Sequence, residues 1–319
     1  MDRFDAMQAF ARVAETGSFT KAAETLRTNK TSVTQIIQQL EARLRVKLLH
    51  RTTRKVQVTA DGAAYYERVV RLLAELDDTE ASLSGAAASP RGRLRVDVPS
   101  PLACFVLMPA LPDFHARYPE IQIDLGASDR MVDLIRDNVD CVIRGGEITD
   151  PSLIARRVGE LPISAYAAPA YLRQHGTPTH PKDLEGPAHR IVGFMNTRTG
   201  RVQAYATQRQ PGKKNPKAAA KEAERITVQG RYMLSVDDGV AYLAAGVAGL
   251  GVLWLPRYLA AEHQQRGELV PLFEDWQFPS MPLTLAYPPN RYVGARLRVF
   301  IDWMVALMAR QAPVGGDMP

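Results

Sequence analysis

The sequence has few cysteines and no long apolar run. Only Cys104 and Cys141 occur in 319 residues, and both lie among apolar neighbours, so we expect two buried thiols, the alternative being a redox pair. No stretch reaches the roughly 18 apolar residues of a membrane span. The first ten residues lack the basic region and apolar core of a secretory signal. These absences predict a cytoplasmic chain with no membrane partner.

Catalytic and metal-binding motifs are also lacking. There is no His-Glu-x-x-His pair and no Gly-x-Ser-x-Gly turn. Gly212-Lys213-Lys214 lacks the spacing and the hydroxyl residue of a phosphate loop, and the glycines of 246–251 join a helix to a strand, the reverse of a dinucleotide fingerprint. We therefore expect no catalytic residue, no metal ligand, no cofactor and no enzyme.

What the sequence does have is a concentration of positive charge at its start. Residues 1–59 carry 11 Lys/Arg against 5 Asp/Glu, whereas residues 60–319 carry 29 of each. A basic head on a neutral body indicates a module that binds a polyanion such as nucleic acid.

Three helical patterns follow one another in this head. The first has a stripe at Phe4, Met7, Phe10 and Val13, and Gly17 is placed to end it in a left-handed cap. Ser18 caps a second, small-residue helix, and Asn29 caps a third whose inner face is Val33, Ile37, Leu40 and Leu44.

The outer face of the third helix suits the major groove of DNA, although a solvated helix face looks the same. Gln pairs with adenine, a Thr methyl contacts thymine, and Lys reaches guanine or phosphate. The basic segment 48–59 then indicates a two-stranded wing beside the phosphate backbone. The predicted DNA-binding residues are Lys30, Thr31, Thr34, Gln35, Gln38, Arg51, Arg54 and Lys55.

A long helix is predicted from about residue 60 to Leu83. Its seam of Tyr66, Val69, Leu73, Leu76 and Leu83 fits a partner helix, the alternative being packing on its own domain. Residues 84–93 indicate a hinge.

The body alternates short β-rich runs with helices, which predicts parallel sheets. Ligands of such folds bind at the carboxyl ends of strands, where we find Ser100, Ser128 and Arg144. Arg144 is suited to gripping a carboxylate. The alternatives are helix caps for the two serines and a nearby Asp partner for Arg144. A helix is also predicted over 131–136.

At this point the chain resembles the LysR-type transcriptional regulators. The resemblance lies in FARVAETGSFTKAAETL (Phe10–Leu26), SVTQIIQQLEARL (Ser32–Leu44) and LLHRTTRKVQVTADG (Leu48–Gly62), and less specifically in Asp129–Pro162 and Ser235–Pro256. The family usually has Gly where Arg45 stands here, and Ser-Gln where Asn29-Lys30 stands.

The resemblance implies an α/β effector domain of two lobes, like a periplasmic binding protein, behind an all-α winged helix-turn-helix and a linker helix. The implied domains are 1–59 for the head, 60–92 for the dimerising linker, 93–161 plus 269–310 for lobe I and 162–268 for lobe II. The crossovers would fall near 160–163 and 268–272. Matching residue by residue gives the effector site Ser100, Ser128, Arg144, Phe194 and Asp237, where Asp237 has helix capping as its alternative.

The expected function is a sequence-specific transcriptional regulator that responds to a small effector, an organic anion. The expected partners are double-stranded DNA, the effector, a second copy of the chain as a homodimer or homotetramer, and RNA polymerase. The alternatives are a cytoplasmic α/β enzyme or a solute-binding protein with an added DNA-binding head. Residues 207–225 carry six Lys/Arg and two Asp/Glu, and we expect an exposed loop there, the alternative being a second electropositive patch.

Overall fold

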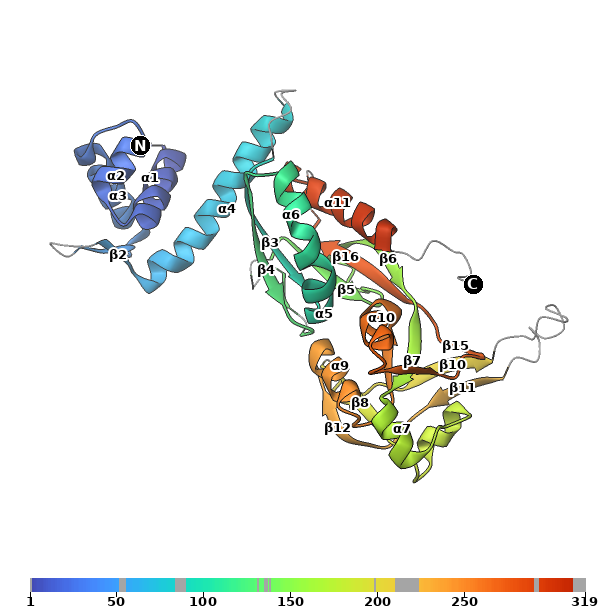
Figure 1. Ribbon diagram of the computed structural model, residues 1–319. Coiled ribbons are helices and arrows are strands. Elements are labelled where there is room, and N and C mark those ends of the chain that lie inside the picture. The colour runs from blue at the N-terminus through green and yellow to red at the C-terminus, as the bar shows by residue number, and fades with distance from the viewer. Residues whose placement is uncertain are drawn as a thin grey trace. The chain divides into compact units, whose positions relative to one another are not determined.

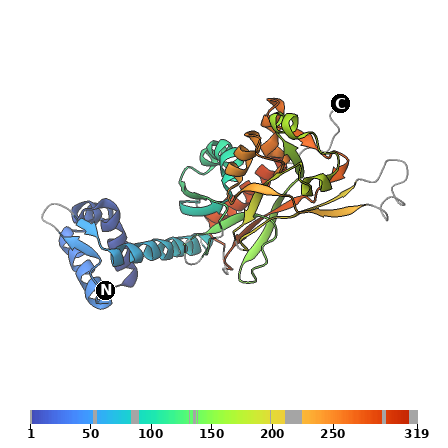
Figure 2. The ribbon, with the colours of Figure 1, turned by 90° about the horizontal axis from the view of Figure 1, so that it is seen from below.

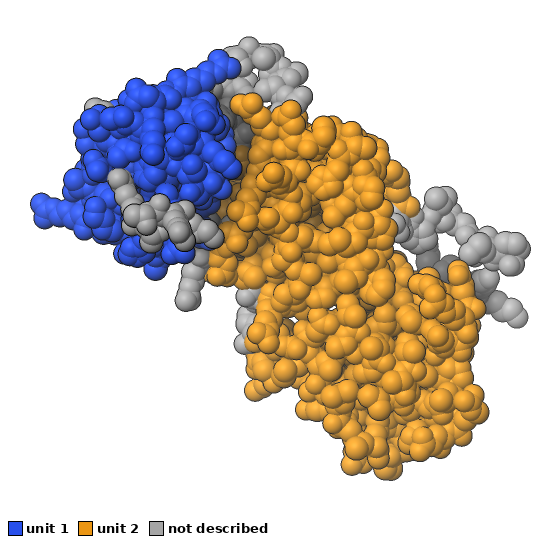
Figure 3. All heavy atoms as spheres, turned by 60° about the vertical axis from the view of Figure 1, so that its left-hand side comes forward, with its two compact units in different colours: residues 1–89 blue, residues 90–319 orange. Residues whose placement is uncertain are grey.

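The computed structural model describes residues 2–51, 56–83, 90–130, 132–134, 137, 139–197, 199–209, 224–289 and 293–311. The chain forms two compact units, residues 1–89 and residues 90–319 (Figure 3). Among the described residues, no helix is long and apolar enough to cross a membrane.

Unit 1 contains the predicted helices and wing. Its elements are α1 (Arg3–Thr16), α2 (Phe19–Thr25), α3 (Lys30–Leu44), the antiparallel pair β1 (Leu49–Arg51) and β2 (Val56–Val58), and α4 (Ala60–Leu83) (Figure 1). The helix boundaries follow from local capping. Gly17 ends α1 with φ 61°, the Ser18 side chain accepts the Lys21 N–H at the start of α2, and the Asn29 side chain accepts the Ser32 N–H at 2.7 Å.

The core of unit 1 differs from the predicted stripe at one position. Phe10 and Val13 are fully buried, but Phe4 is 44% exposed and its expected place is taken by Ala6 and Ala9. A strict three-residue spacing drifts around a helix that has 3.6 residues per turn, so Phe4 leaves the inward face.

Lobe I of unit 2 is a five-stranded sheet in the order β4-β3-β5-β16-β6. Its strands are β3 (Gly92–Val98), β4 (Ile121–Ala127), β5 (Cys141–Gly145), β6 (Ile154–Leu161) and β16 (Met281–Tyr287), and its helices are α5 (Ser100–Leu102), the π-helical turn η1 (Ala103–Leu107), α6 (Met108–Arg117) and α11 (Ala295–Gln311).

Helices α6 and α11 lie side by side over this sheet (Figure 1). The Phe114 ring meets Phe300 and Trp303 with centroids 5.8 and 5.0 Å apart. The Trp303 indole N–H donates to Asp113 at 3.2 Å. This aromatic packing joins the two ends of unit 2 within a core that is otherwise mainly aliphatic.

Lobe II is built from three small three-stranded sheets, ordered β13-β7-β14, β12-β8-β9 and β11-β10-β15. The β10–β11 pair projects from the lobe in two views (Figures 1 and 2). The remaining elements of unit 2, all in this lobe, are β7 (Ile163–Ala167), α7 (Pro169–His175), the 3-10 turn η2 (Pro181–Glu185), β8 (Ile191–Asn196), β9 (Arg201–Val202), β10 (Tyr205–Arg209), β11 (Arg225–Val228), β12 (Tyr232–Val236), α9 (Gly239–Val247), β13 (Leu253–Pro256), α10 (Arg257–Gln265), β14 (Val270–Leu272) and β15 (Trp276–Gln277).

The sheets are mixed, which corrects the expectation of parallel sheets. Strand β3 is parallel to β4 and β5, and β8 is parallel to β12. Strand β16 is antiparallel to β5 and β6, and β7 is antiparallel to β13 and β14. Antiparallel pairs arise because strands from late in the chain pair with strands from early in the chain. No local sequence pattern indicates such pairing.

The second crossover also lies later than predicted. The chain leaves the large sheet at Pro162, inside the expected range, but β14 still pairs with β7 and β15 with β10. The return to lobe I therefore falls between Gln277 and Met281, and residues 269–277 belong to lobe II. The predicted range 268–272 was wrong because β14 is short and its partner strand is about a hundred residues away in sequence.

Two local predictions were also wrong. Of the predicted helix 131–136, the described residues 132–134 are not helical, although the Asp137 N–H bonds to the Asp133 carbonyl at 2.8 Å as in a single turn; residues 131, 135 and 136 lie outside the described residues. Cys104 is exposed on η1, whereas Cys141 is fully buried, and burial raises the pKa of its thiol. The wing tip at 52–55, the hinge at 84–89 and the insertion at 210–223 lie outside the described residues.

Candidate nucleic-acid interface and effector site

Helix α3 has a buried face and an exposed polar face. Val33, Ile37 and Leu40 are fully buried against α1 and α2. The predicted DNA-binding residues of this helix lie on the opposite face, with Lys30, Thr31, Gln35 and Gln38 exposed and Thr34 half-buried. A row of amide, hydroxyl and ammonium groups on one face matches the hydrogen-bonding groups that base edges present in the major groove.

The hairpin after α3 adds the second part of the interface. His50 pairs with Gln57 across the hairpin and is exposed. Arg51 lies on β1, while Arg54 and Lys55 lie outside the described residues. The basic segment therefore follows α3 directly in the chain, as an antiparallel hairpin.

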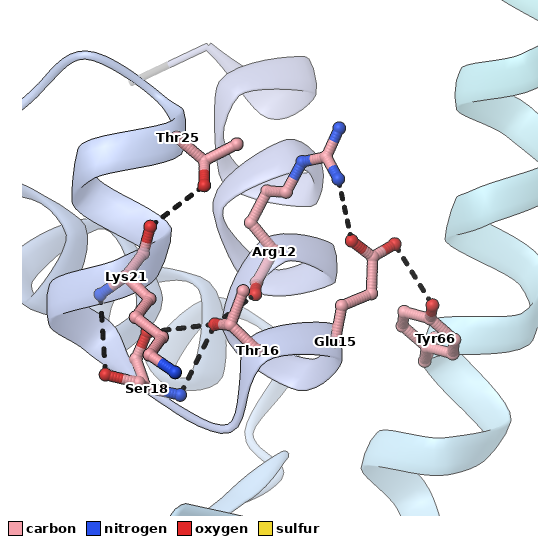
Figure 4. Close-up of polar contacts among 7 residues, drawn as sticks. All are labelled: Arg12, Glu15, Thr16, Ser18, Lys21, Thr25 and Tyr66. Atoms are coloured by element: carbon pink, nitrogen blue, oxygen red, sulfur yellow. Dashed lines mark hydrogen bonds and ion pairs between the residues drawn. The ribbon is translucent and has the colours of Figure 1, made fainter.

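Unit 1 also fixes α1 to α4 through polar contacts around Glu15 (Figure 4). Its carboxylate accepts the Tyr66 hydroxyl at 3.1 Å and pairs with Arg12 at 2.8 Å. Two expected seam residues are already engaged in a single chain, since Val69 is fully buried and Tyr66 bonds to α1. Leu72 is 48% exposed and is the one large apolar side chain that is exposed among the described side chains of α4.

The predicted effector residues of lobe I are engaged with their own neighbours. The Ser128 hydroxyl accepts the Arg130 N–H at 3.0 Å. Arg144 forms an ion pair with Asp97 on the adjacent strand, and its guanidinium also donates to the Arg130 carbonyl at 2.9 Å. The Asp97 partner is the alternative that the sequence left open for Arg144. Arg144 therefore orders the 128–130 loop, with its charge balanced inside lobe I.

Residues at the start of α9 meet this loop. The cap of α9 is Asp238, which accepts the Val240 and Ala241 N–H groups at 3.0 and 2.9 Å. Asp237 is not the cap. It faces Arg130 across the lobes at 3.9 Å. Burial acts to raise the pKa of Asp238, but hydrogen bonds from Ser100 and from the α9 backbone hold it below the usual value.

Asp129 makes a direct contact between the lobes. Its carboxylate accepts the Gly239 N–H at 2.8 Å. A Cβ at Gly239 would lie 2.4 Å from Cγ of Pro101, so this approach requires glycine. Burial, together with the charges of Asp238 and Asp237, raises the pKa of Asp129. The two lobes thus touch through a carboxylate seated on the amino terminus of α9.

Phe194 lies on β8 of lobe II and is partly buried. Its ring packs edge-on against Tyr242, with centroids 5.2 Å apart. The Tyr242 hydroxyl lies 3.3 Å from that of Tyr205, and burial raises the pKa of Tyr205 to about 12. A groove of about 400 Å³ lies elsewhere, beside β10, β11 and β15, and contains none of the predicted residues.

Sequence reasoning missed the roles of Glu41, Asp129 and Arg130. Glu41 bonds to residues six to eight positions further on. Arg130 is exposed and held by Arg144 through its carbonyl. Asp129 stands beside Ser128 in the sequence, where nothing marks it as an interlobe contact. No spacing signal identifies such residues, because their partners come from other elements.

A compact helix-turn-helix unit with a hairpin, followed by a two-lobed α/β unit, defines a DNA-binding regulator with an effector domain. The comparisons agree. Residues 4–63 match the model of the bacterial regulatory helix-turn-helix protein, lysR family, and residues 87–309 match the LysR substrate binding domain. The chain belongs to the LysR family of transcriptional regulators.

Relatives match over nearly the full length. An HTH-type transcriptional repressor of Pseudomonas aeruginosa is 37% identical over 98% of this chain and 95% of its own. The HTH-type transcriptional activator AaeR of Escherichia coli is 31% identical over 95% of this chain and 93% of its own. The solved structure of CrgA, a LysR-type regulator of Neisseria meningitidis, is 30% identical, covers 97% of this chain and 99% of its own, and has a TM-score of 0.57.

These matches decide between a transcriptional regulator and the two alternatives, an α/β enzyme and a solute-binding protein. The protein is a LysR-type transcriptional regulator with a DNA-binding head and an effector-binding domain, and it is not an enzyme. The predicted fold class, a winged helix-turn-helix with a linker helix and a two-lobed α/β domain, is confirmed.

Proposed function

We propose that the exposed face of α3 reads base edges in the major groove while the hairpin contacts the flanking phosphates. The observation that carries the proposal is the division of α3 into a fully buried apolar face and an exposed polar face. Gln38, Gln35 and Thr34 supply base-reading groups there, with Lys30 and Thr31 at the helix start. Arg51, Arg54 and Lys55 supply the phosphate contacts.

The test is binding of DNA fragments selected from a random pool by the full-length protein, measured by fluorescence anisotropy beside scrambled fragments. Gln38→Ala should cost about 1–3 kcal/mol on selected DNA and little on scrambled DNA. Gln8→Ala, which removes an exposed glutamine from α1, is the matched control. Equal losses on both fragments would show that Gln38 does not read bases.

We further propose that the effector is a small organic anion bound where the two lobes meet, by Ser100, Ser128, Phe194 and Asp237, with Arg144 ordering the loop. Arg130 is the cation that the ligand would reach first, because Arg144 is balanced by Asp97 while the Arg130 side chain is 79% exposed. Since Asp129 bonds directly to α9, binding would replace or rearrange this interlobe contact and shift the population of lobe arrangements.

Thermal-shift measurements with benzoate and with succinate test this site. A carboxylate that stabilises the wild type should lose its effect in Arg130→Ala and keep it in Arg173→Ala, an exposed arginine on α7. A full shift in Arg130→Ala would remove this residue from the site.

The remaining proposals concern assembly and location. The exposed Leu72, with the half-buried Leu73 and Leu76 beside it, supports a homodimer through α4, or a homotetramer of such dimers. Sedimentation of Leu72→Glu would test this, and a wild-type mass would exclude the contact. We place the protein in the cytoplasm, beside the DNA it binds and with RNA polymerase as a further partner. Cell fractionation and co-purification from cell extracts test these two points.

A further inference from the structure

Glu41 is a buried acid at the junction of α3 and the hairpin. It is 4% exposed, and among the described side chains of unit 1 it is the one charged group that is buried. A carboxylate is removed from water only where hydrogen bonds compensate it, so its partners indicate what it does.

The two carboxylate oxygens of Glu41 bond to different groups. Oε1 accepts both the Leu48 and the Leu49 backbone N–H groups, at 2.9 and 3.1 Å. Oε2 accepts the Lys47 ammonium at 2.9 Å. Leu48 and Leu49 are themselves buried and lead into β1. One side chain of α3 therefore holds the first strand of the hairpin by its backbone.

The same residue also ends the helix. The Glu41 carbonyl accepts the Arg45 N–H at the left-handed end of α3, and the Val46 N–H at 3.3 Å. The chain turns back here, and Leu48 in turn accepts the Thr59 N–H at 3.0 Å. Burial acts to raise the pKa of Glu41, but Lys47 and the two backbone N–H groups outweigh it and lower the pKa below its usual value.

We propose that Glu41 is a positioning residue for DNA binding, which fixes the hairpin to the recognition helix through its Oε1 acceptor. Base reading by α3 and phosphate contact by the hairpin then occur at one fixed spacing. The inference rests on the proposed DNA contacts of these two elements.

Two substitutions separate reach from charge. Glu41→Gln keeps the side-chain length and a carbonyl oxygen that accepts both N–H groups, but removes the charge. Glu41→Asp keeps the charge but is one methylene too short for the hairpin. Glu24→Gln, at an exposed position of α2, is the control for removal of charge in unit 1.

The experiment measures DNA affinity of the full-length variants against salt concentration, on selected and scrambled fragments, and amide hydrogen exchange at Leu48 and Leu49. Glu41→Gln should stay within about twofold of wild type, whereas Glu41→Asp should weaken both fragments about tenfold and flatten the salt slope by about 0.9 for each phosphate that the hairpin no longer reaches. The Leu48 and Leu49 amides should exchange faster in Glu41→Asp.

A general loss of stability lowers the active fraction and leaves the salt slope unchanged, so the slope distinguishes positioning from folding. Glu41→Gln failing while Glu41→Asp binds normally would overturn the proposal in favour of charge. Unchanged amide exchange in Glu41→Asp would overturn the contact itself. If the Leu48 and Leu49 amides exchange faster in Glu41→Asp but DNA binding does not change, the contact to the hairpin is real and the positioning role of Glu41 is refuted. Separate assays of Gln38→Ala and Arg51→Ala would then show whether the proposed DNA contacts fail as well.

Discussion

Arg45 ends α3 in the left-handed region, with φ 56° and ψ 30°. An L-residue there costs roughly 1–2 kcal/mol, which glycine avoids. Glycine also increases the conformational entropy of the unfolded chain, which lowers the free energy of unfolding by roughly 0.4–1 kcal/mol. The difference predicts that Arg45→Gly stabilises unit 1 by about 0.5–1 kcal/mol. A stabilisation of about 1 kcal/mol would raise the midpoint temperature of thermal unfolding of a domain this size by about 4–8 °C.

The assay follows each unit separately. All three tryptophans, Trp254, Trp276 and Trp303, lie in unit 2. Their fluorescence therefore reports unit 2, while far-ultraviolet circular dichroism also follows the helices of unit 1. Arg45→Gly should raise the unit 1 transition and leave the tryptophan transition in place.

Two matched variants isolate the backbone contribution. Arg45→Ala removes the charge but keeps the Cβ, so it should be neutral. Gly17→Ala introduces a Cβ at φ 61°, where nothing lies within 4 Å of it, and should destabilise unit 1 by about 1 kcal/mol from backbone strain alone. The reasoning is refuted if Arg45→Gly leaves the unit 1 transition unchanged, or if Arg45→Ala stabilises as much as glycine.

Three further predictions concern unit 2, all read from tryptophan fluorescence during urea unfolding. Phe114→Ala should cost about 3–5 kcal/mol, because the ring is fully buried between α6 and α11; a cost near zero would mean that the core repacks. Arg144→Ala should cost about 3–5 kcal/mol by leaving Asp97 buried without its partner, and the Asp97→Ala double variant should recover part of it; additive losses would argue against the pair. Burial raises the pKa of Asp129, so its ionised form costs stability above that pKa and the cost disappears as pH falls through it. Asp129→Asn should therefore be more stable than wild type near pH ~7, with an advantage that shrinks toward pH ~4; a constant difference would exclude titration of Asp129.

The helices and wing of unit 1 were predictable because their signals are local. Gly17, Ser18 and Asn29 each act within three residues of their own position. The family's usual glycine at the end of α3 also pointed to strain at Arg45, and the structure shows a positive φ there. No sequence pattern indicated the strands β6, β9, β10, β12, β14 and β15 or the helices α7 and α10. Most of these are short elements that carry little periodicity, and β6, although eight residues long, is exposed over its first four residues.

The effector region shows the opposite case. Sequence position alone placed Ser100, Ser128 and Arg144 at strand ends. In the structure, Ser128 and Arg144 both bond to Arg130, while Ser100 bonds to Asp238. Sequence position could not show that Asp97, 47 residues before Arg144, lies on the neighbouring strand and neutralises the charge of Arg144. Nor could it show Asp129 reaching α9, 110 residues away.

The sequence by itself determined the class of the protein, the order of its parts and the exposed face of α3, because charge distribution, capping and helical period act over a few residues. Only the tertiary structure decided which charged groups are already paired, as Arg144 is, and which acid fastens the hairpin, as Glu41 does. Such pairing depends on strand register and on turns that bring distant residues within about 3 Å of one another, and these are set by the packing of the whole unit.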